Sequence, residues 1–128
     1  MNPPIFVLDT SFILALLNPD DILHEQTVAQ IFAIKANEIR FEIPLICLIE
    51  SIIKQPEPQS IIAYLKELID QRDFEVTVKD DAEFIANLPL KTRNTLKAND
   101  CIVLAISNRL GAKLFSLDKK LLKAYNSL

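Results

Sequence analysis

Four acidic residues stand in apolar segments of this chain, where an ionised carboxylate is costly unless another group meets its charge. They are Asp9, Glu50, Asp100 and Asp118. Four carboxylates that converge on one pocket repel one another unless hard cations bind between them. All-oxygen ligands select magnesium or manganese rather than zinc. Such a site activates a water and stabilises an in-line transition state at phosphorus, so the pattern predicts Mg²⁺- or Mn²⁺-dependent phosphoryl chemistry.

Two of these acids follow predicted strands. Asp9 comes directly after the apolar run 5–8, and Asp118 follows the short apolar run 112–115. In open α/β sheets ligands bind at the carboxyl ends of the strands, which places both acids for chemistry. Each acid also has a structural alternative, because an Asp before a helix caps it and an Asp after a strand forms turns.

The other two acids lie on predicted helices. Glu50 stands in the apolar run 45–53, and its neighbours one turn away are isoleucine and cysteine. Its alternative is a position at the helix edge, paired with Lys54. Asp100 opens the apolar helix 98–110, with Asn99 before it as a candidate cap. Its alternative is simple complementarity with the helix dipole.

The elements that must position these acids alternate along the chain. Strands are predicted at 5–8, 41–43, 74–78 and 112–115, with helices between them and a last helix from 119 to about 125. This order indicates an α/β fold with a parallel sheet. The alternating run 74–78 predicts an edge strand. The helix 98–110 is predicted to be buried and to end at Gly111, the only glycine.

Composition bounds the class of protein. A chain of 128 residues with 50% hydrophobic content fits a single domain over 1–128, and we expect no membrane span, no export signal and a cytoplasmic location. Cys47 and Cys101 lack metal-site spacing and indicate buried, reduced thiols. The single histidine, His24, gives almost no material for a zinc site or a serine hydrolase triad.

The net charge of −3 depends on which acids are counted. Without the four candidate ligands, 14 bases face 13 acids. Bound divalent cations would cancel the ligand charge, so the acidity does not exclude a phosphate substrate. It does exclude a strongly basic docking surface.

At this point the sequence resembles the PIN domain family. The resemblance rests on segments 7–11, 48–50, 99–102 and 115–118, in that order, and covers nearly the whole chain. It implies a three-layer α/β/α fold and a metal-dependent ribonuclease. Small single-domain bacterial and archaeal members are commonly toxins of VapBC-type toxin–antitoxin pairs, so the resemblance also implies an antitoxin partner.

Carried over by position, the four acids become the metal-binding and catalytic residues. Ser11 and Ser116 resemble the family's hydroxyl positions that support the acids or the metal. The family usually has a fifth strand after the fourth acid, whereas this chain continues into a helix at Lys119. The expected sheet therefore has four strands, or five with one edge supplied by a partner.

The leading hypothesis is a Mg²⁺- or Mn²⁺-dependent endoribonuclease. The alternative is a catalytically idle PIN-fold module that binds RNA or protein. A phosphoryl-accepting receiver domain is disfavoured, because its lysine belongs at the end of the last strand and Lys113 lies at the start. Lys91, Arg93 and Lys97 are a candidate basic rim for RNA phosphates, with a solvated loop as the alternative.

The last predicted helix suggests association. Leu121, Leu122 and Tyr125 supply an apolar face beside lysines, and an unprotected sheet edge invites pairing. Twofold contacts are the commonest oligomer symmetry. The sequence therefore predicts a homodimer through this helix, although the same surface could receive an antitoxin helix.

Overall fold

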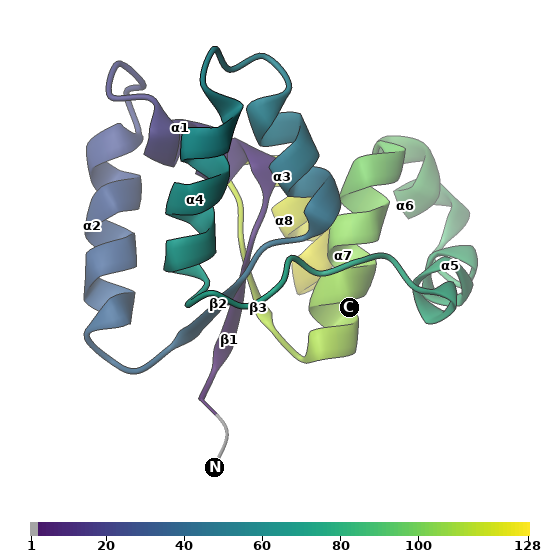
Figure 1. Ribbon diagram of the computed structural model, residues 1–128. Coiled ribbons are helices and arrows are strands. Elements are labelled where there is room, and N and C mark those ends of the chain that lie inside the picture. The colour runs from purple at the N-terminus through teal and green to yellow at the C-terminus, as the bar shows by residue number, and fades with distance from the viewer. Residues whose placement is uncertain (1–2) are drawn as a thin grey trace.

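The computed structural model describes residues 3–128 and contains a three-stranded parallel sheet flanked by helices (Figure 1). The strands are β1 (Ile5–Leu8), β2 (Arg40–Glu42) and β3 (Lys113–Phe115), in the order β2-β1-β3. The helices are α1 (Thr10–Leu17), α2 (His24–Lys35), α3 (Leu45–Ile52), α4 (Pro58–Leu68), α5 (Lys79–Ala86), α6 (Leu90–Thr95), α7 (Ala98–Leu110) and α8 (Lys119–Asn126). Figure 1 shows α1, α2 and α4 on one side of the sheet and α5, α6 and α7 on the other. The predicted α/β class with a parallel sheet is confirmed.

β1 is the central strand, as its unbroken apolar run predicts. It pairs in parallel with both neighbours, and Val7 and Leu8 have no exposed surface. The ladder extends one residue further, because the backbone N–H of Asp9 donates to the carbonyl of Phe115 at 3.1 Å. Asp9 therefore stands at the carboxyl end of the middle strand, where the sequence predicts it.

The predicted edge strand over 74–78 is wrong, and so is the expected count of four or five strands. Within residues 3–128 this segment forms only one bridge, between Glu75 and Pro44. Proline has no N–H to continue a ladder, and Val76 and Val78 are 54% and 38% exposed, so no sheet face is there to cover them. The chain after Asp118 is helical to Asn126, and no further strand follows in the described range.

α7 and α8 close the other side of the sheet. Most of α7 is buried, and it ends at Gly111 with φ 62°, the left-handed cap that the sequence predicts. The predicted exposed apolar face of the last helix is wrong. Leu121 of α8 has no exposed surface, and the Tyr125 hydroxyl donates to the carbonyl of Ala112 at 2.8 Å. α8 uses its apolar side for its own core.

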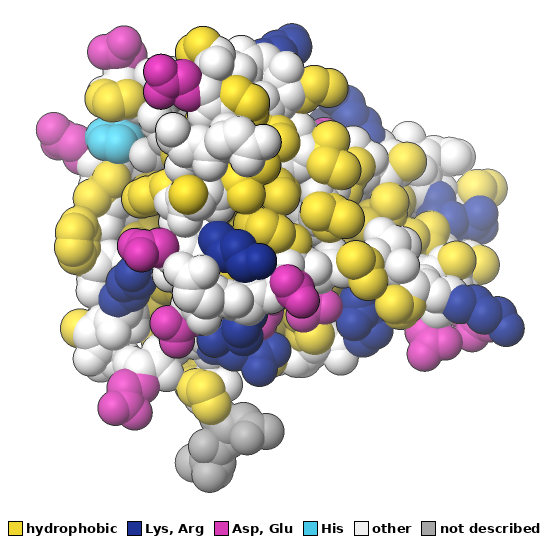
Figure 2. Space-filling view, viewed as in Figure 1, with side chains coloured by type: hydrophobic (Ala, Val, Ile, Leu, Met, Phe, Trp, Pro, Cys, Tyr) yellow, Lys and Arg dark blue, Asp and Glu magenta, His cyan; other side chains and the backbone are white. Residues whose placement is uncertain are grey.

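An exposed apolar stripe lies instead on α3. Leu45, Ile49 and Ile53 follow one another at intervals of four residues and are 37%, 45% and 72% exposed. Figure 2 shows hydrophobic side chains gathered on the face over α3. We call these three residues the α3 stripe. Within residues 3–128 no helix is both long and apolar enough to cross a membrane.

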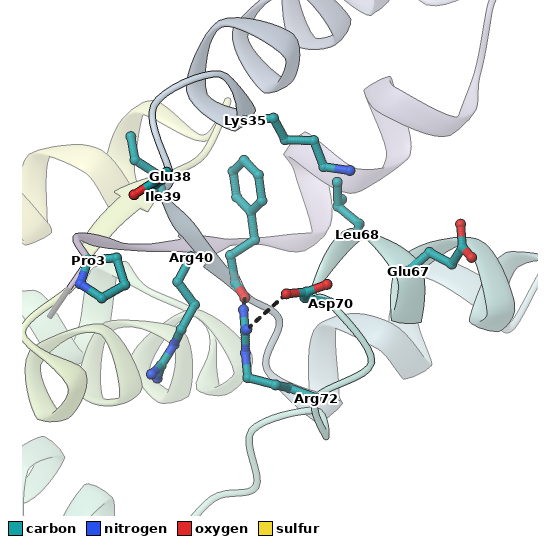
Figure 3. A pocket seen from close by; sticks show the side chains of 10 residues that line it. Pro3, Lys35, Glu38, Ile39, Arg40, Glu67, Leu68, Asp70 and Arg72 are labelled. Carbon is teal, nitrogen blue, oxygen red and sulfur yellow. Dashed lines mark hydrogen bonds and ion pairs between the residues drawn. The ribbon is translucent and has the colours of Figure 1, made fainter.

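A groove of about 400 Å³ lies where β2 begins and α2 and α4 end (Figure 3). Three bases and three acids line it, so it offers no net charge to a ligand. They are Lys35, Arg40, Arg72, Glu38, Glu67 and Asp70.

Beside this groove lies a buried carboxylate, Glu42, which is 1% exposed. Arg40 Nε and Arg72 Nε approach its Oε1 at 2.8 and 3.1 Å. Burial raises the pKa of Glu42, and the two guanidinium groups oppose the rise. Arg72 also donates to the carbonyl of Phe41 at 3.0 Å. The cluster fastens the chain after α4 to β2, which is a structural task.

Candidate functional site

Asp9 is a buried carboxylate held by three donors. It is 4% exposed and forms the N-cap of α1, accepting from the backbone N–H of Phe12 at 3.1 Å. The hydroxyl of Ser11 donates to Oδ1 at 2.8 Å and that of Ser116 to Oδ2 at 2.6 Å. The capping alternative is therefore confirmed for Asp9. Capping does not exclude metal binding, because Oδ2 accepts only the Ser116 hydroxyl and keeps a second lone pair.

Ser11 and Ser116 join the first and the fourth acidic segments. The Leu117 backbone N–H donates to the Ser11 hydroxyl, and the Asp118 backbone N–H donates to the Ser116 hydroxyl, both at 2.9 Å. The two hydroxyl oxygens lie 3.3 Å apart. Each serine hydroxyl thus donates to Asp9 and accepts from a backbone N–H just before α8.

Asp118 caps α8, as its own structural alternative predicts. Its Oδ1 accepts from the backbone N–H groups of Lys120 and Leu121 at 2.9 and 3.2 Å. Its Oδ2 accepts no hydrogen bond from residues 3–128. One oxygen of Asp118 is therefore occupied by the helix, and the other faces no protein donor.

Glu50 bridges three helices. Its Oε1 accepts from the hydroxyl of Thr10 on α1 at 2.7 Å, and its Oε2 accepts from the amide of Asn99 on α7 at 2.9 Å. The alternative pairing with Lys54 is absent among the described ion pairs. Glu50 is half-buried, and its partners are a hydroxyl and a side-chain amide.

The contacts of Glu50 with Thr10 and Asn99 were not predicted from the sequence. Asn99 was predicted as a cap, but Lys97 occupies the N-cap of α7 and Asn99 lies in the first turn. Both residues are sequence neighbours of predicted ligands, Thr10 after Asp9 and Asn99 before Asp100. The position of a polar residue next to a predicted ligand could have drawn attention to Thr10 and Asn99. The sequence could not show that both contact Glu50, which is 40 and 49 residues away from them.

Asp100 lies in the first turn of α7, and the charges of the other three acids affect its pKa. Burial raises its pKa most, followed by the charges of Asp118 and Asp9, and Glu50 adds to the rise. Burial also raises the pKa of Asp9 against its hydrogen bonds, and Asp118 contributes to that rise. The structure therefore brings all four predicted acids into one electrostatic neighbourhood.

These raised pKa values predict how stability depends on pH without metal. At pH values between 3.8, the ordinary pKa of Asp, and the raised pKa of Asp100 in the folded protein, the folded state binds more protons than the unfolded state. The free energy of unfolding therefore falls as pH rises through this range. Above the pKa of the folded protein, the ionised carboxylate lowers the stability by its full amount. Asp100→Asn removes one titrating group and thereby reduces the charge repulsion on the other three acids.

We expect thermal melts in chelator to show the largest gain of Asp100→Asn over wild type near pH 7 and a smaller gain near about pH 4. Asp20→Asn, which changes an exposed acid, serves as the control. An equal difference between Asp100→Asn and wild type at every pH would contradict the repulsion among the acids.

The donor set fits a hard divalent cation in its chemistry, because all four candidate ligands are carboxylates. In the described part of the chain, no group of three His, Cys, Asp or Glu is already arranged so that it could hold a metal ion. Cys47 is fully buried near the acids, and burial raises the pKa of its thiol to about 12, with Asp9 and Glu50 adding to the rise. A neutral thiol is not a ligand, which leaves oxygen donors alone.

The residues of the predicted basic rim lie on α6 and at the N-cap of α7. Lys91, Arg93 and Lys97 are all exposed, as a solvated segment would be. The Arg93 Nε donates to the carbonyl of Leu88 at 3.1 Å, which gives Arg93 a structural contact. The alternative of a solvated loop is wrong for residues 91–94, which belong to the helix α6. Lys91 therefore lies on a helical face.

Comparisons with known proteins agree with this fold. The profile of the PIN domain family matches residues 6–126. The fold is similar to that of a chain in the crystal structure of VapBC2 from Rickettsia felis bound to a DNA fragment from their promoter, with a TM-score of 0.66 and 14% sequence identity. That match covers 93% of this chain and 91% of the other. No curated protein matches the sequence. Because the family profile spans nearly all of the sequence, this chain belongs to the PIN domain family.

Proposed function

We propose that this protein is a Mg²⁺- or Mn²⁺-dependent endoribonuclease in which residues 1–128 form one domain. PIN domains are generally nucleases, and Asp9, Glu50, Asp100 and Asp118 are the ligands that we assign here. The observation that carries the proposal is the electrostatic coupling of Asp100 to the other three acids, which come from separate parts of the chain. Among residues 3–128, no positively charged side chain is one of the main groups that shift the pKa of Asp9 or Asp100, so a cation is the natural complement.

The surrounding side chains orient these ligands. Ser11 and Ser116 hold both oxygens of Asp9, and Thr10 and Asn99 hold both oxygens of Glu50. Fixed outer partners of this kind set the direction of a ligand's free lone pairs. Bound ions would activate a water and neutralise charge that develops on the scissile phosphate.

A cleavage assay with metal removal tests the proposal. We expect the purified protein to cut a panel of single-stranded and structured RNAs with added Mg²⁺ or Mn²⁺, to stop in excess chelator, and to recover when the ion is restored. A DNA panel of the same sequences measures the preference for RNA. An idle binding module would bind RNA and leave it intact at every metal concentration.

We also propose that the protein is the toxin of a VapBC-like pair and associates through its α3 stripe. The likeness to the VapBC2 structure supports this pairing at the level of fold. Exposed Leu45, Ile49 and Ile53 give α3 an apolar face that suits a second copy or an antitoxin helix. Light scattering across a dilution series tests the homodimer, and a monomer mass throughout, with Ile53→Glu unchanged, would reject self-association through the stripe.

A further inference from the structure

The charge of this chain is divided along its length. Residues 91–128 contain eight Lys and Arg and two acids, Asp100 and Asp118, which are both proposed ligands. The first 90 residues contain six Lys and Arg against 15 acids. The net charge of −3 therefore conceals a strongly basic last third. The expectation that overall acidity excludes a basic docking surface does not hold for this part of the chain.

α6 and α8 bring three of these bases to one groove of about 460 Å³. Its polar lining consists of Lys91, Lys120, Lys123, Thr92, Thr95 and Ser127. We call it the α6–α8 groove. No acid lines it. The three lysines are exposed, and none takes part in an ion pair within residues 3–128.

Helical spacing explains why these side chains share the groove. Lys120, Lys123 and Ser127 recur at three and four residues along one face of α8, and Lys91 and Thr95 are four residues apart on α6. Ammonium groups donate only, and hydroxyls can donate as well. This lining therefore suits a ligand that offers many acceptor oxygens and negative charge, as a phosphate backbone does.

Both walls of the groove are continuous in the chain with residues of the acidic site. On α8, Lys120 is two residues after Asp118, whose carboxylate accepts its backbone N–H. On the other wall, the buried Leu96 follows α6 and comes three residues before Asn99, which contacts Glu50. Each wall of the groove thus lies within three residues along the chain of a proposed ligand or of its hydrogen-bond partner.

We propose that the α6–α8 groove binds the phosphate backbone of single-stranded RNA beside the acidic site. This inference rests on the proposed nuclease function. The groove has the volume of a small-ligand site, which suits one strand better than a double helix. No aromatic side chain lines it, so it offers no stacking platform and holds the strand without selecting a base. Lys91 of the predicted rim belongs to it, and Arg93 does not.

RNA binding can be measured apart from cleavage in the Asp9→Asn background with chelator present. Fluorescence polarisation of a labelled oligouridylate would compare this parent with the same chain carrying Lys91→Gln, Lys120→Gln and Lys123→Gln. A matched control carries Lys35→Gln, Lys66→Gln and Lys79→Gln, which removes the same charge from the acidic part of the chain. Thermal melts of each variant confirm folding.

We expect the groove variant to bind RNA at least tenfold more weakly than the parent, and the control to change less than threefold. The slope of log affinity against log salt should fall by about 2, because each lost phosphate contact removes about 0.7 on a single strand. Equal affinity of groove variant and parent, or no RNA binding by the parent, overturns the inference.

An acidic protein segment is the competing occupant. If polyglutamate binding is lost in the groove variant while RNA binding is retained, the groove serves such a segment and the inference is overturned. Cleavage by the wild type is scored separately. A wild type that cuts no RNA, together with the predicted loss of RNA affinity, would reject the nuclease and support the groove.

Discussion

Replacing Asp9 with Asn is expected to lower the rate of RNA cleavage about a thousandfold, which corresponds to several kcal/mol of lost transition-state stabilisation. The substitution removes a ligand's charge and keeps its shape. The fold should persist, because Asn is as good an N-cap as Asp and can still accept from Phe12. Serine hydroxyls can rotate to accept from the new amide, so Ser11 and Ser116 keep partners.

The control for this experiment is Asp20→Asn, which makes the same chemical change at an exposed acid before α2. It should cleave RNA at the wild-type rate. Circular dichroism and thermal melts of both variants separate loss of chemistry from loss of fold. Equal cleavage by Asp9→Asn and wild type on a broad RNA panel would show that the assigned mechanism is wrong.

Divalent cations are expected to raise the melting temperature of the wild type by roughly 10 °C at a hundredfold excess over the dissociation constant. At that excess, binding to the native state alone contributes about 2.7 kcal/mol. For a chain of this size each kcal/mol shifts the midpoint by a few degrees. The ions also cancel the mutual repulsion that raises the pKa values of Asp9 and Asp100.

The shift should shrink strongly in Glu50→Gln, which loses one negative charge. Its carbonyl oxygen can still accept from the Asn99 amide, and the Thr10 hydroxyl can rotate to accept from the new NH₂ group. Without metal this variant should be as stable as the wild type or more stable. Glu25→Gln on the exposed side of α2 is the matched control and should keep the full shift. If neither Mg²⁺ nor Mn²⁺ changed the melting temperature of the wild type, and Glu50→Gln were less stable than the wild type, Glu50 would have a structural role instead.

The elements with a continuous signal were predictable from the sequence. The unbroken apolar run before Asp9 placed β1 in the middle of the sheet, and the apolar helix with Gly111 after it placed α7. Both signals are local, because burial on all sides and a left-handed cap each leave their mark within one segment. The positions of Asp9 and Asp100 followed directly from these two elements.

The failures depend on contacts between distant residues. The alternation in 74–78 satisfies the pattern of a strand, but Arg109 holds Glu75 and the Val76 carbonyl from α7 instead. The apolar residues of α8 did not show whether they face a partner or their own core. Likewise, Thr10 and Asn99 reach Glu50 only after three helices have met.

The double use of Asp9 and Asp118, as helix caps and as proposed ligands, has a genetic consequence. A single transition in the first base of an Asp codon produces Asn, which still caps a helix but carries no charge. Under the proposed toxin function, a cell that must escape this activity thus has two one-base routes to a chain that folds and accumulates without cleaving RNA. Inactive alleles arising under such selection would keep the shape of the protein, and any partner that recognises that shape would still be titrated by it.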